Sequence, residues 1–231
     1  MADSEQQQLP DTSEPSEERK ASLEAVYERQ KDTDAPYKGV VIDTAGELLW
    51  MMRQRKWEAA HHRLPYGMKR ANFRGIQLYE VNLTDFHLRG ADLRDVHFTR
   101  SNLTGADLIG ANLSNVDFNG SNLSKTDLTR ATLTGADFIE ADLSNATFRF
   151  ANMSDIDFIR ANLSNADFSS TNLSRARFGR AILSGANFTL ADLSGADLRA
   201  VTMNIETNLD FIKLSTSTKL GDVRWNGVYL L

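Results

Sequence analysis

The sequence predicts an all-β solenoid, a rod wound from many short blocks of chain. From Ala71 to Ile205 the chain divides into 27 consecutive five-residue blocks without an insertion, and the third residue of every block is Leu, Phe or Met. A period of five fits neither a helix, which places apolar residues at i, i+3, i+4 and i+7, nor a strand, which alternates strictly. A fixed internal period is instead typical of repeat architectures.

The residue types at each block position predict that two side chains of a block point inward and three point outward. The first residue is usually Ala or another small or mid-sized residue, the second is mostly Asp or Asn, and the fourth is often Ser or Thr. With the first and third residues inside, the chain must turn a corner in every block. Short polar side chains at the second position can bond neighbouring backbone groups and stabilise those turns, and the Gly residues found at many fifth positions serve the corners.

The block pattern resembles the pentapeptide-repeat family. It is carried by blocks such as Ala106-Asp107-Leu108, Ala161-Asn162-Leu163-Ser164-Asn165 and Ala191-Asp192-Leu193-Ser194-Gly195. The resemblance covers residues 71–205 and implies a right-handed, four-sided β-helix in which four blocks make each coil.

The spacing of the phenylalanines agrees with a coil of four blocks. Third positions that lie four blocks apart should stack, and one such column, bracketed by Leu78 and Leu198, contains Phe98, Phe118, Phe138, Phe158 and Phe178. Stacked rings would add offset aromatic packing to the burial of the core. At about 4.8 Å per coil, the 27 blocks predict six to seven coils and a rod roughly 32 Å long.

Two segments precede the blocks. Residues 1–38 carry ten acidic and five basic residues, net −5, and their Glu, Gln, Ser and Pro content predicts a largely disordered acidic tail with a short helix near 21–31. Residues 39–70 contain the sequence Thr44-Ala45-Gly46-Glu47 before an apolar run, which fits a capping box and predicts a helix over about 45–62. We expect this helix to cap the open first coil, since terminal repeats need a cap.

The C-terminal segment, 206–231, predicts an irregular stretch and then a partial coil. The block register slips after Ile205, and first and third positions recover only at Val223 and Trp225. Three alternatives stay open for this end. Its apolar residues close the rod, it packs on a second copy as a homodimer, or the chain is part of a longer protein.

Composition predicts a protein without catalytic or metal chemistry. The chain has no Cys, which excludes disulfides, thiolate metal sites and a Cys nucleophile. The four histidines, His61, His62, His87 and His97, follow no metal-binding spacing, and the numerous Asp and Ser residues belong to the repeat. We therefore expect no enzyme and no cofactor. No signal peptide begins at Met1 and no apolar run is long enough to span a bilayer, which predicts a cytoplasmic protein.

Two outward columns beside the phenylalanines predict an interaction surface. Asp117, Asp137 and Asp157 form an acidic ladder at second positions, and Ile139 and Ile159 stack at fourth positions. Other outward apolar residues, Ile109, Phe150, Ile182 and Leu190, are taken as scattered. Single exposed apolar residues mean little, but the stacked pair beside the ladder is a candidate protein-binding stripe.

The sequence leaves two functions in competition. The first is a non-catalytic scaffold or interaction module with a protein partner that the sequence does not identify. The alternative follows from the resemblance, because family members of this shape protect DNA gyrase by imitating DNA. Duplex DNA carries one charge per about 1.7 Å, so a rod of this length would need roughly 19 negative charges. Residues 71–205 hold fifteen acidic and twelve basic residues, a net charge of −3, and direct nucleic-acid binding is not expected either.

Overall fold

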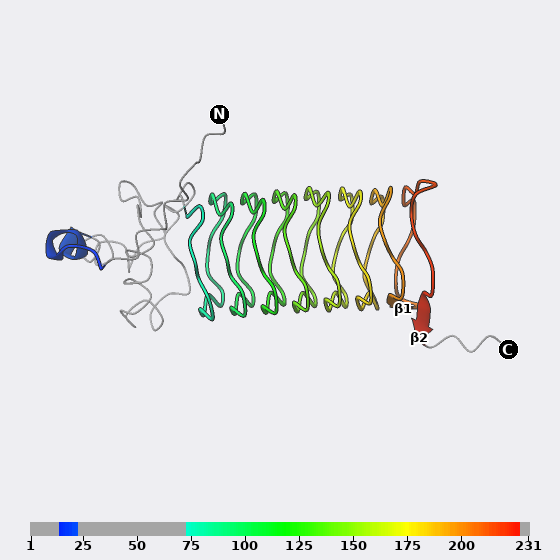
Figure 1. Ribbon diagram of the computed structural model, residues 1–231, viewed down its shortest axis with the longest axis horizontal. Coiled ribbons are helices and arrows are strands. Elements are labelled where there is room, and N and C mark those ends of the chain that lie inside the picture. Colours follow the sequence, from blue (N-terminus) through cyan, green and yellow to red (C-terminus); the bar gives the residue numbers. More distant parts are fainter. Residues whose placement is uncertain (1–13, 23–72, 227–231) are drawn as a thin grey trace, which may run out of the picture.

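Residues 73–226 wind into a rod of stacked coils (Figure 1). The structure, a computed structural model, describes this range and residues 14–22. Single-residue parallel bridges join second positions that lie four blocks apart, from Gln77↔His97 along the chain to Ile182↔Thr202. The chain therefore completes one coil in four blocks, as the phenylalanine spacing predicts.

Backbone hydrogen bonds between coils hold each block in place. In the block 121–125, the N–H of Asn122 donates to the Ser101 carbonyl of the preceding coil at 2.9 Å, and the N–H of Leu123 donates to the Asp142 carbonyl of the next coil at 2.7 Å. A third bond closes the corner, where the Thr126 N–H donates to the Leu123 carbonyl at 3.2 Å. Repetition of this pattern satisfies the backbone on each face, which a buried solenoid wall requires.

The second-position side chains brace the corners. The Oδ1 atom of Asn162, for example, accepts the backbone N–H of Ser164 at 3.2 Å, and that of Asp167 accepts the N–H of Ser169 at 2.9 Å. The fifth residue of each of these blocks then takes a left-handed backbone, with φ of 59° at Asn165 and 57° at Ser170. Asp and Asn at the second position are thus explained by turn chemistry alone.

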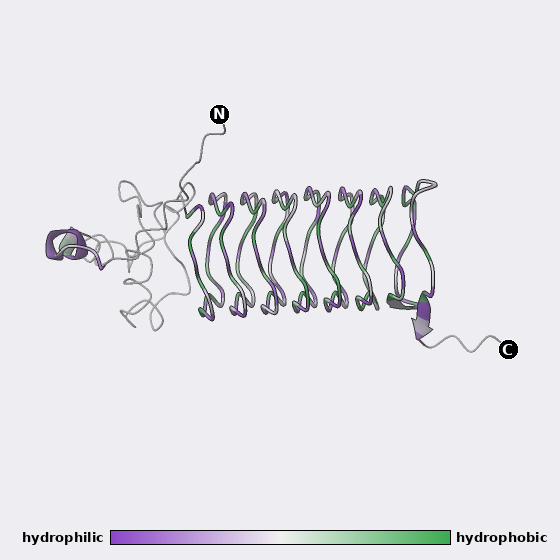
Figure 2. Cartoon of the chain, in the orientation of Figure 1, coloured by the Kyte–Doolittle hydropathy of each residue, from purple (hydrophilic) through white to green (hydrophobic). Residues whose placement is uncertain are grey.

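The core is filled by the central residues of the blocks. The third residue of every block from Phe73 to Met203 is buried, with at most 3% of its surface exposed. Figure 2 shows hydrophobic and hydrophilic segments alternating around each coil, in agreement with two inward and three outward residues per block. Hydroxyl groups at inward first positions are satisfied by backbone carbonyls, as Thr126 Oγ1 donates to Leu123 at 2.7 Å.

The phenylalanines lie in two columns. The rings of the predicted column stack at 4.8–5.3 Å between centroids from Phe98 to Phe178. On the opposite wall, Phe148, Phe168 and Phe188 stack at 4.9 Å. The two columns meet edge to face, with 5.9 Å between the rings of Phe158 and Phe168.

The segment predicted to be irregular, 206–222, forms most of one further coil. Asn208 bridges to Asn187 and Lys213 to Asp192, each pair one position further apart than in the regular coils. Lys219 bridges to Asp197 with a second extra position, and strands β1 (Thr202–Asn204) and β2 (Arg224–Asn226) pair in parallel with the same offset. Two single-residue insertions at the corners therefore shift the register without ending the fold, and they hid this coil from a strict five-residue pattern.

The N-terminal predictions fall mostly outside the described residues. Within the acidic tail, residues 17–22 are helical, and Lys20 Nζ lies 2.6 Å from Glu17 and 3.2 Å from Glu14. The predicted helix near 21–31 lies almost wholly beyond this segment. The predicted helical cap over 39–70 lies outside the described residues altogether.

Candidate interaction surface

The acidic ladder lies along one face of the rod, with its carboxylates already engaged. Asp117 and Asp137 are bridged, as are Asp137 and Asp157, so the three side chains stack in adjacent coils. Each Oδ1 accepts the backbone N–H two positions further along the chain, at 2.9 Å for Asp117, 3.1 Å for Asp137 and 2.9 Å for Asp157. One oxygen of each ladder carboxylate is therefore used by the corner, and the other is available to neighbours.

Cationic and polar side chains flank the ladder. His97 Nδ1 lies 3.5 Å from Asp117 Oδ2 at one end, and Arg177 Nη1 lies 2.7 Å from Asp157 Oδ2 at the other. Between them, the Asn119 side-chain amide donates to Asp137 Oδ2 at 3.1 Å. The ladder thus ends at an imidazole on one side and at a guanidinium on the other.

Asp157 is the most enclosed carboxylate of the ladder, with 9% of its surface exposed. Burial raises the pKa of this carboxyl, while the Ile159 N–H and the Arg177 guanidinium act to lower it; neighbouring Asp137 adds to the rise. The side chain of Asp157 is therefore mostly enclosed, at 13% exposed, whereas that of its partner Arg177 is 62% exposed.

The predicted isoleucine stripe runs beside the ladder and is only half-exposed. Ile139 and Ile159 are both of intermediate burial. In the next coil, the position corresponding to Ile159 is Gly179, where an added Cβ would lie 3.7 Å from Ile159 Cγ1. The stripe therefore ends at Gly179, which has no side chain to continue it.

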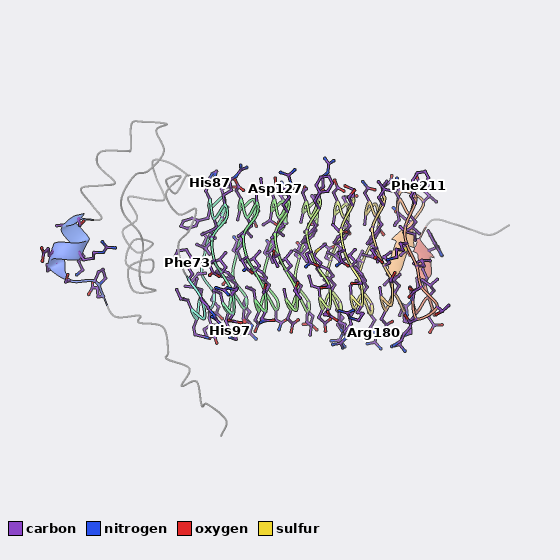
Figure 3. The ribbon with its side chains drawn as sticks, turned by 90° about the horizontal axis from the view of Figure 1, so that it is seen from above. Phe73, His87, His97, Asp127, Arg180 and Phe211 are labelled. Carbon is purple, nitrogen blue, oxygen red and sulfur yellow. The ribbon has the colours of Figure 1, made fainter. Side chains whose placement is uncertain are left out.

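Outside the ladder, acidic side chains on the rod are also paired with cations. Arg160 Nη1 lies 2.8 Å from Glu140 Oε1, and Arg175 Nη2 lies 2.5 Å from Asp155 Oδ2, each pair joining consecutive coils. Figure 3 shows His97 and Arg180 on one edge of the rod and His87 and Asp127 on the opposite edge. Negative charge is therefore interspersed with positive charge.

The structure also groups apolar residues that sequence reasoning took as scattered. Phe150 and Leu190 occupy the same corner of the rod, two coils apart, with 53% and 60% of their surfaces exposed. Phe211, 80% exposed, continues that corner in the last coil. The separation of Phe150 and Leu190 by eight whole blocks could have revealed this pair, but the insertion after β1 hid Phe211.

The last coil has further exposed apolar side chains. Leu214, Leu220 and Trp225 are 44%, 54% and 48% exposed. The homodimer predicted to form through this end remains a prediction.

Metal and membrane features were searched within the described ranges. Across 14–22 and 73–226, no group of three or more His, Asp or Glu side chains is placed to hold a metal ion. The same residues contain no helix with the length and apolar character needed to cross a membrane. The two described histidines each lie near one aspartate, His87 near Asp107 and His97 near Asp117, on different faces.

Comparison with protein families decides the identity of the rod. The family model described as pentapeptide repeats matches in eight copies, over residues 76–115, 111–149, 141–180 and 161–199, which together span more than half of the chain. The chain belongs to the pentapeptide-repeat family. Membership implies a right-handed β-helix.

Several solved structures are similar to this pentapeptide-repeat protein. The plasmid-mediated fluoroquinolone resistance protein QnrB1, in a trypsin-treated variant form, is 17% identical with a TM-score of 0.39, covering 63% of this chain and 84% of QnrB1. A pentapeptide repeat protein of the Arabidopsis thaliana thylakoid lumen is 28% identical with a TM-score of 0.35, covering 44% of this chain and 70% of its own. One from Nostoc is 30% identical with a TM-score of 0.26, covering 49% and 84%. No curated protein matches the sequence of this pentapeptide-repeat protein.

Proposed function

We propose that this protein is a non-catalytic scaffold whose β-helix presents a rigid surface to a protein partner. The observation that carries the proposal is the face that combines the acidic ladder with the isoleucine stripe. Its side chains are fixed in rows by bridges between coils and by hydrogen bonds to the corners. A surface ordered in advance loses little conformational entropy on binding, which favours its use in recognition.

The chemistry of this face fits a partner that offers apolar and basic groups. Ile139 and Ile159, both of intermediate burial, provide the apolar contact, and Gly179 ends their row without a side chain. The second oxygens of Asp117 and Asp137 already accept hydrogen bonds from Thr99 and Asn119, so a basic side chain of the partner would share these oxygens with those donors. Charged pairs at the edge of an interface mainly set specificity and association rate.

A catalytic role is not favoured by the placement of the polar side chains. Catalytic groups usually lie in concave, partly dry sites that shift their pKa values. The described Asp and His residues instead lie on the outside of a rod whose interior is filled by buried third-position side chains. Their hydrogen bonds go to the turn backbone and to neighbouring coils, a structural use.

The test is the variant Ile159→Arg in a pull-down from native lysate. We expect this variant to lose the captured partner by at least about tenfold, because a charge would replace the apolar centre of the stripe. Ile109→Arg is the matched control, since Ile109 is also a half-buried fourth-position isoleucine but lies on the opposite face. Equal capture by wild type and the Ile159 variant would reject the stripe as the binding surface.

A regulator of DNA gyrase or another topoisomerase, acting by DNA imitation, is the second candidate. It rests on the regular spacing of Asp117, Asp137 and Asp157, but the Arg177 guanidinium paired with Asp157 opposes it. A supercoiling assay with purified gyrase, with and without a fluoroquinolone, separates the two functions. Activity or drug protection at micromolar protein would replace the scaffold proposal, and no effect would retire this candidate.

A further inference from the structure

One corner of the rod carries three large apolar side chains and one serine in a row, which we name the corner ridge. It consists of Phe150, Ser170, Leu190 and Phe211 in four consecutive coils. Figure 3 shows Phe211 at the end of the rod, on the same edge as His87 and Asp127. Its three large side chains are open to solvent, since Phe150, Leu190 and Phe211 are 53%, 60% and 80% exposed.

The ridge residues share the left-handed backbone of the other fifth positions, and what sets them apart is that they are apolar. Phe150, Leu190 and Phe211 have φ values of 59°, 62° and 56°, in the left-handed region that large side chains disfavour. In the three coils before Phe150 the same corner is Gly90, Gly110 and Arg130, and the Arg130 guanidinium lies 5.9 Å from the centre of the Phe150 ring. Being mostly exposed, the three apolar side chains add little to the core, so packing inside the rod does not account for them.

The sizes of the side chains along the ridge would let two antiparallel copies of the ridge fit together. The ridge runs large, small, large, large from Phe150 to Phe211. When it is reversed, Phe150 faces Phe211 and Leu190 faces the small Ser170. A two-fold axis perpendicular to the rod, between the coils of Ser170 and Leu190, produces this pairing.

The neighbouring row of fourth positions has complementary charges under the same operation. That row reads Arg149, Ser169, Thr189 and Asp210. Reversal brings Arg149 opposite Asp210 and the two hydroxyl residues opposite each other. Arg149 is held only loosely within its own rod, 53% exposed and 3.8 Å from Asp167, with its guanidinium 5.7 Å from the centre of the Phe150 ring.

We propose that two copies of this chain associate side by side and antiparallel along the corner ridge. Phe150 packs against Phe211 of the partner subunit, Leu190 inserts over Ser170 of the partner subunit, and Arg149 pairs with Asp210 of the partner subunit. A parallel pairing in register would leave Ser170 against itself and would bring no opposite charges together. This proposal stands independently of the scaffold function, which uses a different face.

Sedimentation velocity of the full chain tests the association. We expect wild type to dimerise in the micromolar range, and Leu190→Arg to weaken the dimer at least about tenfold. Leu190→Gly should weaken it too without loss of fold, because Gly suits the left-handed corner. Ile182→Arg, which alters a 43% exposed isoleucine elsewhere on the rod, should leave the dimer unchanged. Wild type that stays monomeric at about 100 µM would overturn the proposal.

Charge reversal tests the antiparallel register. Arg149→Asp alone and Asp210→Arg alone should each weaken the dimer, since each places like charges together, and the combined variant should restore it. Failure of the combined variant to exceed both single variants would overturn the assigned pairing.

Engineered cysteines separate this arrangement from other dimers, because the chain has no Cys of its own. Phe150→Cys mixed with Phe211→Cys should form a disulfide-linked dimer on mild oxidation, and neither variant should do so alone. A parallel dimer would cross-link each variant with itself, and contact through the C-terminal end would cross-link Phe211→Cys alone. Either of those results would contradict the antiparallel ridge.

Discussion

The two halves of the rod share one backbone but differ in how their cores are packed. In the earlier coils, the stacked rings of Phe98 and Phe118 share the core with leucines of the opposite wall, such as Leu108. In the later coils, phenylalanine lines both walls, and Phe158 and Phe168 meet edge to face at 5.9 Å. The comparison shows that the five-residue block determines where the buried third position lies, but not whether leucine or phenylalanine occupies it.

The difference concentrates aromatic contacts in the later coils. Phe158 stacks on Phe138 and Phe178 and meets Phe148 and Phe168 edge to face. In a solenoid each repeat contacts only its neighbours, so stability is approximately a sum of local terms. The later coils should therefore be the more resistant part of the rod.

Removal of one ring from each half gives the largest expected effect. Phe158→Ala and Phe98→Ala both vacate fully buried sites, and each should lower the free energy of unfolding by about 3–5 kcal/mol. Phe158→Ala should cost about 1–2 kcal/mol more, because Phe158 has four aromatic neighbours and the ring contact of Phe98 is with Phe118. Guanidinium chloride denaturation followed by circular dichroism measures both, and equal losses would contradict the comparison.

Replacement of a phenylalanine of the later coils by leucine, the residue on that wall in the earlier coils, should lower the free energy of unfolding by less. Phe168→Leu keeps the core apolar but removes stacking on Phe148 and Phe188, which should cost about 1.5 kcal/mol. Leu173→Met, at a buried site in the next block, is the volume-conserving control and should cost less than about 1 kcal/mol. If the two variants unfold at the same denaturant concentration, the second phenylalanine column adds nothing beyond burial.

The face that carries Asp92 near one end and Asp192 near the other pairs these two carboxylates differently. Hydrogen bonds from Arg94, in the same block, lower the pKa of Asp92 against partial burial. At Asp192, partial burial raises the pKa, but hydrogen bonds from Lys213 and Ser194 lower it to about 2. Lys213 belongs to the last coil and its Nζ lies 2.7 Å from Asp192 Oδ2, so this second pair joins two coils.

The sign follows from the depressed pKa in the folded chain. The contribution of Asp192 is fully present above its ordinary value of 3.8 and is lost as the pH falls toward 2. The carboxyl carbon shift of Asp192 should titrate near pH 2 in wild type and closer to pH 4 in Lys213→Met. A titration unaltered by Lys213→Met would show that the pair does not form in solution.

Much of the rod could be predicted from the sequence because its determinants are local and repeated. The resemblance to the pentapeptide-repeat family implied four blocks per coil, the recurrence of phenylalanine at every fourth block agreed with it, and bridges such as Asp117↔Asp137 have that spacing. The Asp and Asn residues at second positions predicted side chains that brace the turns, and Asn162 and Asp167 do so. The acidic ladder and the isoleucine stripe follow from the same spacing of four blocks.

What the sequence could not give were the relations between residues that the repeat does not encode. The coil at 206–226 tolerates two inserted residues because insertions at corners leave the bridged positions aligned. The partners of the ladder carboxylates, such as Arg177 for Asp157, depend on where flexible side chains lie in three dimensions.

The sequence alone determined the coil, the inward residues and the braced corners, since each depends on residues within one block or on a fixed offset. Only the tertiary structure decided that the two phenylalanine walls meet edge to face and that Phe211 joins Phe150 and Leu190 at one corner. The physical reason is that contacts across the rod and beyond an insertion depend on how coils stack, which no five-residue pattern records.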